Sequence, residues 1–315
     1  MLENNTFANF FTDKMANYYG EWVALATAFF WTFTALLMET ASKRIGSLHV
    51  NLFRLGLASL FLGVFTLFTR GLFLPVDADI HNLAWLALSG IIGFVIGDYC
   101  LFKAYSINGA RITMLFTTLA PVFAAIAAWI LLGEVLSWSN LLAMLVTLMG
   151  IALVVLNRAP KEQGKRQKVK IGYALNGILF AIGAAAGQGV GLVLSKYGMR
   201  EYNPFAAAHI RVMAGFLGFV LIFTVLRKWK YVPESVKDHT SMRNVALGTI
   251  TGPVIGVGLS LLAVQHAHVG IAQTLMSLTP VLIIPFAVIF HHERPKVREI
   301  IGAIIAVGGV AIFFL

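Results

Sequence analysis

The sequence predicts an all-α integral membrane protein, with ten transmembrane helices arranged as two inverted five-helix repeats. Three observations lead to this fold. The 315 residues are 58% hydrophobic and 12% charged, with a mean hydropathy of +0.81. Apolar runs of bilayer-spanning length recur along the chain, and its two halves align at a constant offset. Because about a quarter of the residues in soluble proteins are charged, this composition excludes a soluble enzyme.

Ten apolar segments are each long enough to cross a bilayer as a helix, which takes about 20 residues. A helix satisfies its own backbone in lipid, and no segment shows the alternating pattern of an outer-membrane strand. The segments cover residues 22–41, 50–69, 83–106, 112–133, 137–157, 171–194, 204–227, 244–265, 270–290 and 297–315. The polar N-terminal segment, residues 1–21, has neither the basic start nor the cleavage site of a signal peptide.

Lysine and arginine are distributed unevenly between the loops, and this predicts the orientation of the chain. With the N-terminus outside, the inner loops hold 18 of the 24 Lys and Arg residues and the outer loops hold four. Positive charge favours the cytoplasmic side, so both termini are predicted on the outer, periplasmic side of a bacterial inner (plasma) membrane. The same topology accounts for the net charge of +10. No nucleic acid is expected as a partner, because the basic linker lacks interleaved aromatic residues.

An internal repeat divides the chain. A shift of 159 residues aligns the last three spans of the first half with the last three of the second, without a gap. The matched pairs include Gly93 and Gly252, Gly97 and Gly256, Pro121 and Pro280, Glu134 and Glu293, and Gly150 and Gly309. Arg54 and Arg211 match at a shift of 157. The predicted organisation is a first repeat (22–157), a basic linker (158–170) and a second repeat (171–315).

The number of spans in each repeat predicts how the halves are related. Five is an odd number, so the second repeat lies upside down relative to the first. Secondary transporters use this inverted plan and bind substrate near the midplane, between the halves. We therefore interpret the chain as a transporter that works by alternating access. The alternative is a duplicated membrane scaffold or sensor without transport.

Two stretches resemble the end of an EamA domain, one in each half. The first runs from Leu119-Ala-Pro-Val to Leu132-Gly-Glu-Val, and the second from Leu278-Thr-Pro-Val to His292-Glu-Arg. The whole chain therefore resembles a ten-helix transporter of the drug/metabolite transporter (DMT) superfamily. The resemblance implies a carrier for which amino acids and related polar metabolites are common cargo.

Other residues fit the family pattern unevenly between the halves. Trp31 in the first span and Arg54 at the start of the second fit it. In the second copy, Gln188 stands where Trp31 would repeat, and His291-His292 replaces Leu-Gly before the glutamate. A strictly symmetric site is therefore not expected.

Pro121 and Pro280 lie near the middle of their spans and are predicted to kink them. A proline removes one backbone hydrogen bond, so the carbonyls of Thr117 and Met276 need another donor inside the membrane. The polar residues around them are predicted to line a substrate cavity: Thr117, Thr118, Gln273, Thr274, Ser277 and Thr279. The alternative is a structural kink capped by the same hydroxyl groups.

Asp98 is the only acidic residue deep in a predicted span. An ion at the centre of the bilayer costs about 2.5–3.5 kcal/mol, so Asp98 is predicted to be paired, to be protonated or to face water. Its possible partners are Arg54 and Lys103. In the functional interpretation it binds a cationic substrate group or a coupling proton. In the structural one it forms an ion pair that joins two helices. Tyr99 and Trp31 are predicted to offer flat faces to the substrate.

Three further sets of residues have open interpretations. Arg54 and Arg211 hold matching positions, which fits capping of carbonyls, pairing with an acid such as Glu39, or binding of a substrate anion. Gln188 lies among glycines and is predicted to face protein or a cavity. Glu134 and its counterpart Glu293 end their spans and are predicted to cap helices or pair in the loops.

Motifs of other chemistries are absent from the sequence. The single cysteine, Cys100, and histidine pairs at span ends make no ligand set, so neither a metal nor another cofactor is expected. There is no nucleophile elbow, zinc-protease motif or Walker loop. The chain is therefore predicted to be neither an intramembrane enzyme nor an ATP-driven pump.

These features together predict a secondary transporter, an exporter or exchanger of small polar organic metabolites, with amino acids or related compounds as leading substrates. Nucleotide sugars or sugar phosphates are the alternative cargo, which would need several inward-facing Lys and Arg side chains. The expected partners are a small-molecule substrate and the lipid bilayer, with protons as a hypothetical coupling ion. The direction of transport and the oligomeric state do not follow from the sequence.

Overall fold

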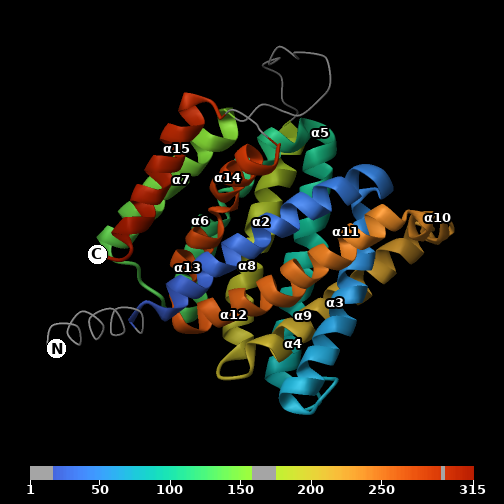
Figure 1. Cartoon of the computed structure of the whole chain (residues 1–315). Coiled ribbons are helices and arrows are strands. Elements are labelled where there is room, and N and C mark those ends of the chain that lie inside the picture. Colours follow the sequence, from blue (N-terminus) through green and yellow to red (C-terminus); the bar gives the residue numbers. More distant parts are fainter. Residues whose placement is uncertain (1–16, 158–174, 292–294) are drawn as a thin grey trace, which may run out of the picture.

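The computed structural model describes residues 17–157, 175–291 and 295–315, and within these ranges it contains helices and no strand (Figure 1). The first half contains α2 (Tyr19–Ile45), α3 (Ser47–Arg70), α4 (Ile80–Gly90), the π-helix η1 (Ile91–Gly97), α5 (Asp98–Thr117), α6 (Ala120–Leu132) and α7 (Trp138–Asn157). The second half contains α8 (Leu175–Met199), α9 (Pro204–Val225), the 3₁₀-helix η2 (Trp229–Tyr231), α10 (Val232–Lys237), α11 (His239–Thr249), the π-helix η3 (Ile250–Gly256), α12 (Val257–His266), α13 (Val269–Met276), α14 (Thr279–His291) and α15 (Val297–Ile312). The predicted all-α class is confirmed.

Nine helical segments of the described chain are long and apolar enough to cross a membrane. The shortest of them has 18 residues, whereas α15, at the place of the tenth predicted span, has 16. The protein is thus a multi-pass membrane protein. The predicted loop between the third and fourth spans (107–111) differs from the structure, because those residues are part of α5. No proline stands there to stop a helix.

The first helix of each half packs mainly against the other half. α2 contacts η3, α11, α12 and α13, and α8 contacts α4, η1, α5 and α6. The second helices of the two halves, α3 and α9, pack against each other. The halves are therefore interlocked, so that α2 and α8 are each coupled to the movement of the other half.

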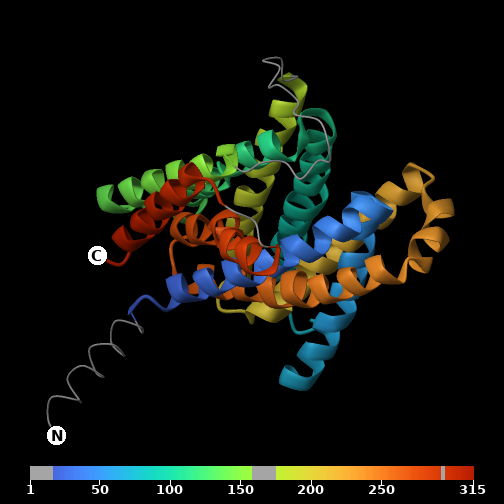
Figure 2. The ribbon, with the colours of Figure 1, turned by 45° about the horizontal axis from the view of Figure 1, so that its top comes forward.

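α7 and α15 lie side by side at one edge of the molecule, with α10 at the opposite edge (Figure 2). Glycines allow this close approach, since a Cβ added at Gly302 would lie 2.8 Å from the carbonyl oxygen of Gly150 and 2.9 Å from the amide nitrogen of Val154. Small residues are the usual means of close helix packing in lipid. The α7–α15 pair joins the last helices of the two halves.

Helix breaks recur 159 residues apart in the two halves. The π-helix of the first half covers 91–97 and that of the second covers 250–256. α5 ends at 117 and α6 begins at 120, while α13 ends at 276 and α14 begins at 279. Matching limits at one offset indicate that both halves interrupt the same two spans at the same places.

Pro121 and Pro280, the predicted kink sites, each lie at the second residue of a helix, α6 or α14, which follows a two-residue break in the helix assignment. Proline is well tolerated in the first turn of a helix, because the amide that it lacks has no partner there. The chain therefore stops one helix and starts another, and Pro121 is buried at that restart.

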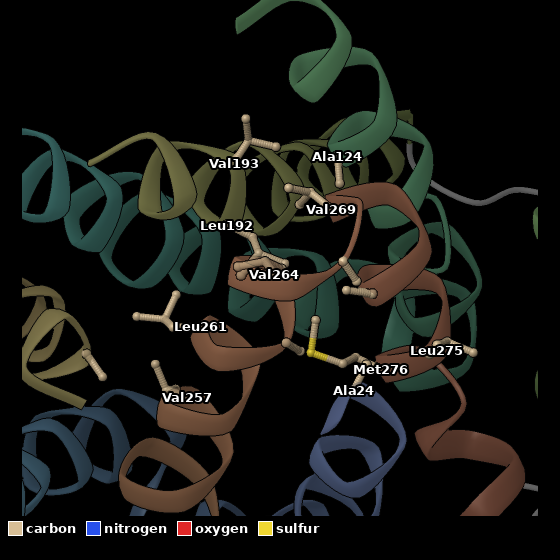
Figure 3. Close-up of a cluster of buried hydrophobic side chains, with 14 of the residues drawn as sticks. Ala24, Ala124, Leu192, Val193, Val257, Leu261, Val264, Val269, Leu275 and Met276 are labelled. Carbon is tan, nitrogen blue, oxygen red and sulfur yellow. The ribbon is translucent and has the colours of Figure 1, made fainter. Parts of the chain in front are cut away.

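Buried apolar side chains fill the region where α2, α6, α8, α12 and α13 meet (Figure 3). Ala24 of α2, Ala124 of α6 and Leu192 of α8 face Val264 of α12 and Met276 of α13 there. The cluster draws on both halves, so apolar packing and dispersion hold the interlocked arrangement together.

Candidate functional site

Asp98 begins α5, directly after η1, and is buried. Arg54 of α3 donates a hydrogen bond to it, with Nη2 2.7 Å from Asp98 Oδ2. A paired carboxylate and guanidinium carry no net charge, which lowers the cost of placing either inside a membrane. The structure thus contains the Arg54–Asp98 pair. The side chain of Glu39, the other acid considered for Arg54, lies outside the described residues.

Arg211 of α9 has a different environment from Arg54, although their positions match in sequence. Its guanidinium lies over the ring of Phe94, with Cζ 5.2 Å from the ring centroid. Phe94 belongs to η1 and precedes Asp98 by one helical turn, since the amide of Asp98 donates to the carbonyl of Phe94. The two arginines therefore reach consecutive turns of the segment that joins η1 to α5.

Trp31 and Gln188 contact the C-terminal glycines of the two π-helices. The indole of Trp31, in α2, packs on Gly256, where a Cβ would lie 2.5 Å from Trp31 Cδ1. Gln188, in α8, lies at Gly97, where a Cβ would be 3.7 Å from the backbone nitrogen of Gln188. The two predicted residues thus occupy matching places, but only Trp31 makes its contact through its side chain.

The hydroxyl groups at the helix breaks bond within their own helices. Thr117 Oγ1 lies 2.9 Å from the carbonyl oxygen of Met114, and Thr118 Oγ1 lies 2.6 Å from that of Leu115. In the second half, Thr274 donates to Gly270 at 2.7 Å and Ser277 donates to Gln273 at 2.8 Å. These bonds match the structural interpretation, in which hydroxyl groups cap the breaks, and each oxygen keeps lone pairs with which to accept.

The remaining predicted residues differ in their exposure. Gln273 and Thr274 are buried in α13. Tyr99 is 38% exposed, and the ammonium of Lys103 lies 6.0 Å from the centroid of its ring. Tyr99 is thus on an outward face of α5, in contrast to its buried neighbour Asp98.

Glu134, just beyond α6, joins three segments of the molecule. Lys196 Nζ, in α8, lies 2.6 Å from Glu134 Oε1 and 2.8 Å from the carbonyl oxygen of Ala267. The amide of Val269, which begins α13, donates to Glu134 Oε2 at 2.8 Å, and His268 Nδ1 lies 3.5 Å from the same oxygen. We call these groups the Glu134 cluster. Glu134 both caps and pairs, as predicted; Glu293 lies outside the described residues.

A pocket of about 300 Å³ opens beside the Glu134 cluster. It is lined by Leu132, Lys196, Tyr197, Arg200, Glu201 and Gln265. None of the predicted substrate residues lines this pocket, so it is separate from the region around Asp98. Sequence reasoning missed the Glu134–Lys196 pair and the Arg211–Phe94 contact. Both join residues far apart in the chain that no local pattern connects.

Comparison with known proteins identifies the family. The EamA-like transporter family matches residues 18–156 and again residues 175–315. This chain belongs to the EamA-like transporter family. The two matches confirm the resemblance to the EamA domain and to DMT-superfamily transporters that the sequence carries, and they assign this multi-pass membrane protein to the transporters.

Relatives of this EamA-family chain include an uncharacterized transporter and a solute carrier. The uncharacterized transporter YdfC of Bacillus subtilis is 23% identical over 269 residues, which cover 85% of this chain and 81% of the relative. Solute carrier family 35 member G1 of Homo sapiens is 25% identical over 227 residues, covering 71% of this chain and 60% of the relative. A protein crystal structure shares the fold, with a TM-score of 0.71, 18% identity, and coverage of 93% of this chain and 96% of the other.

Proposed function

We propose that this EamA-family protein is a secondary transporter in the bacterial inner membrane, an exporter or exchanger of small polar organic metabolites. Amino acids and related compounds are the leading cargo. The matched helix breaks carry this proposal, because secondary transporters built from inverted repeats bind their substrates at interrupted helices of both halves. In the proposed topology α15 is the tenth span, so that each half contributes five.

Alternating access requires one end of the molecule to be closed while the other is open. In the proposed mechanism the Glu134 cluster closes one end, because it joins α6, α8 and the start of α13 through direct polar contacts. The repeat offsets place Glu293 at the position equivalent to Glu134, and Glu39 at that equivalent to Lys196. Two glutamates cannot form an ion pair when both are charged, so we expect no equivalent of the Glu134–Lys196 ion pair at the other end.

We assign coupling to Asp98. The guanidinium of Arg54, 2.7 Å away, favours the ionised form of Asp98. A movement of α3 relative to α5 would leave the carboxylate unpaired and favour uptake of a proton. The cargo in this proposal is not a nucleotide sugar or sugar phosphate, which needs several uncompensated cations. Four cations in or beside the predicted spans are candidates for this role: Arg54, Lys103, Lys196 and Arg211. Arg54 is neutralised by Asp98, and Lys196 by Glu134.

Flux through purified protein in liposomes tests the proposal. A Glu134→Cys, Lys196→Cys pair, made in a Cys100→Ser background, allows the cluster to be joined by a short thiol-reactive crosslinker. We expect uptake of labelled amino acids in the uncrosslinked protein and loss of uptake after crosslinking, with each single-cysteine variant as a control. No flux of any metabolite would refute transport, and flux that survives crosslinking would refute closure at this end.

Coupling has its own measurement. Asp98→Asn keeps the size of the side chain and removes its titration. We expect flux to continue but to become independent of an imposed pH gradient. An unchanged dependence on the gradient would remove Asp98 from this role.

A further inference from the structure

Arg211 is a buried charge with no counter-ion among the described residues. Its side chain is 5% exposed, and it makes no hydrogen bond or ion pair in the part of the chain that the structure describes. Its Nε is buried and has no hydrogen-bond partner among the described residues, and its guanidinium lies over the Phe94 ring. An arginine inside a membrane protein is costly and is normally paired, so binding of an anion would stabilise this guanidinium.

The repeat shows which group is missing. Arg54, the counterpart of Arg211, is neutralised by Asp98. The residue 159 positions after Asp98 is Val257, which is apolar and buried. Among the described residues, one carboxylate serves two matched arginines, so the set of Arg54, Asp98 and Arg211 carries one net positive charge when all three are ionised.

Glycines bring the backbones of two neighbouring elements close to Arg211 and its guanidinium. A Cβ at Gly93 would lie 3.4 Å from Arg211 Nη2, and a Cβ at Gly90 would collide with the carbonyl of Arg211. α8 approaches the same place through Gly191, where a Cβ would lie 3.0 Å from Gly93 Cα. The guanidinium therefore faces the junction of η1 and α8, two of the elements that must shift if the interlocked halves move.

We propose that Arg211 binds the carboxylate of the transported substrate, an inference that rests on the transport function proposed above. A guanidinium presents paired N–H donors that match a carboxylate in a bidentate geometry. One uncompensated positive charge matches one negative charge, whereas a phosphate dianion or a diphosphate needs a second free cation. The substrate class is thus small organic acids and amino acids that present a carboxylate, with the Phe94 ring beside it as an apolar surface.

Binding to purified protein tests the assignment without transport. The probes are small carboxylates (amino acids, hydroxy acids and dicarboxylates), each compared with its own primary amide, and binding is measured as thermal stabilisation and by calorimetry. We expect the wild-type protein to prefer the acid of at least one pair. Arg211→Gln should weaken binding of that acid by about thirtyfold or more, because removing one partner of a buried charge pair costs about 2 kcal/mol or more.

Two variants make the result specific. Arg211→Lys keeps the charge but loses the bidentate fork, so it should retain a reduced preference for the acid. Arg70→Gln removes a paired arginine at the far end of α3, where Arg70 contacts Asp77, and should leave the preference intact. If Arg211→Gln does not fold, the acid–amide comparison in wild type and Arg211→Lys still tests whether Arg211 binds the carboxylate.

The outcomes separate this inference from the proposed function. Equal binding of acids and amides, or tighter binding of a phosphate monoester than of every carboxylate, would overturn the role of Arg211 while leaving transport possible. If carboxylate binding depends on Arg211 but no flux is measured, transport is refuted, while the assignment of Arg211 as a carboxylate-binding residue stands.

Discussion

The two π-helices lie 159 residues apart, and each packs against the first helix of the other half, η1 against α8 and η3 against α2. The kind of contact differs between the two. η1 meets α8 backbone to backbone, since a Cβ at Gly187 would lie 2.9 Å from Gly97 Cα and 3.1 Å from the carbonyl oxygen of Ile92. η3 meets α2 through side chains, Thr34 against Gly252 and Trp31 against Gly256. The same interruption of a span therefore makes a junction without room for side chains in one half and a side-chain-filled junction in the other.

This difference has a consequence for movement. Backbones in direct contact have no side chain that can rotate to make room, so the η1–α8 junction is expected to move as a unit. The η3–α2 junction includes an indole and a threonine pair, Thr34 and Thr251, whose hydroxyl oxygens lie 2.9 Å apart. Side chains can change rotamer, so we expect this second junction to be the more adaptable of the two.

The largest expected effect is at the tight junction. Gly187→Ala places a methyl group against the backbone of Gly97, which cannot turn aside, so α8 and η1 must separate. We expect a loss of about 3 kcal/mol of stability, at the upper end of the range for overpacking, measured by thermal and denaturant unfolding in detergent.

Gly183→Ala provides the matched control on the same helix. A Cβ at Gly183 would have Cys100 Sγ at 3.4 Å as its closest neighbour, so this substitution should be tolerated. Equal stability of the two variants would break the distinction between the two junctions.

A smaller effect is expected at the side-chain junction. Gly252→Ala brings a methyl group to 2.6 Å from Thr34 Cγ2, which one rotation or a small shift of α2 can relieve. We expect a loss of about 1 kcal/mol, at the lower end of the overpacking range. Thr34→Ser removes Cγ2, so adding it to Gly252→Ala should restore part of the stability. Strict additivity of the two substitutions in a double-mutant cycle would contradict the contact.

The sequence predicts the backbone of these junctions better than their partners. The 159-residue offset, read from Gly93, Gly97 and Pro121 and their counterparts, coincides with the limits of both π-helices and both helix breaks. The prolines indicate where the spans are interrupted, but a proline within a helix and one that opens a new helix look alike in sequence. The structure has the second arrangement.

Side-chain partners follow from sequence only where few choices exist. Asp98 is the sole acid deep in a predicted span, so its possible partners could be limited in advance to two bases, Arg54 and Lys103. Phe94 is one of 24 phenylalanines in an apolar chain, and nothing local marks it as the neighbour of Arg211. Lys196 and Glu134 lie in different halves, and their pairing depends on how the halves interlock.

The smallest expected effect compares the helices that lead into the two π-helices. Asp79 caps α4 and Asp238, 159 residues later, caps α11. Asp238 also accepts a hydrogen bond from Arg44 Nε at 2.7 Å, and this bond, followed by that from the Ser241 amide, lowers the pKa of Asp238 to about 2. An unfolded aspartate titrates near pH ~3.9, so the stabilisation is complete above that pH and is lost as the pH falls toward 2.

Removing Arg44 isolates this contribution. Arg44→Gln should raise the pKa of Asp238 toward its ordinary value, so the variant should be less stable than wild type above pH ~4, and its unfolding midpoint should fall less than that of wild type between pH ~4 and ~2. Lys237→Gln removes a nearby positive charge for which no contact with Asp238 is recorded among the described residues, and it should leave the profile close to wild type. Identical profiles for Arg44→Gln and wild type between pH ~2 and ~4 would mean that the Arg44 bond is not maintained in solution. Asp238 would then cap its helix as Asp79 does, by accepting a hydrogen bond from a backbone amide of the first turn.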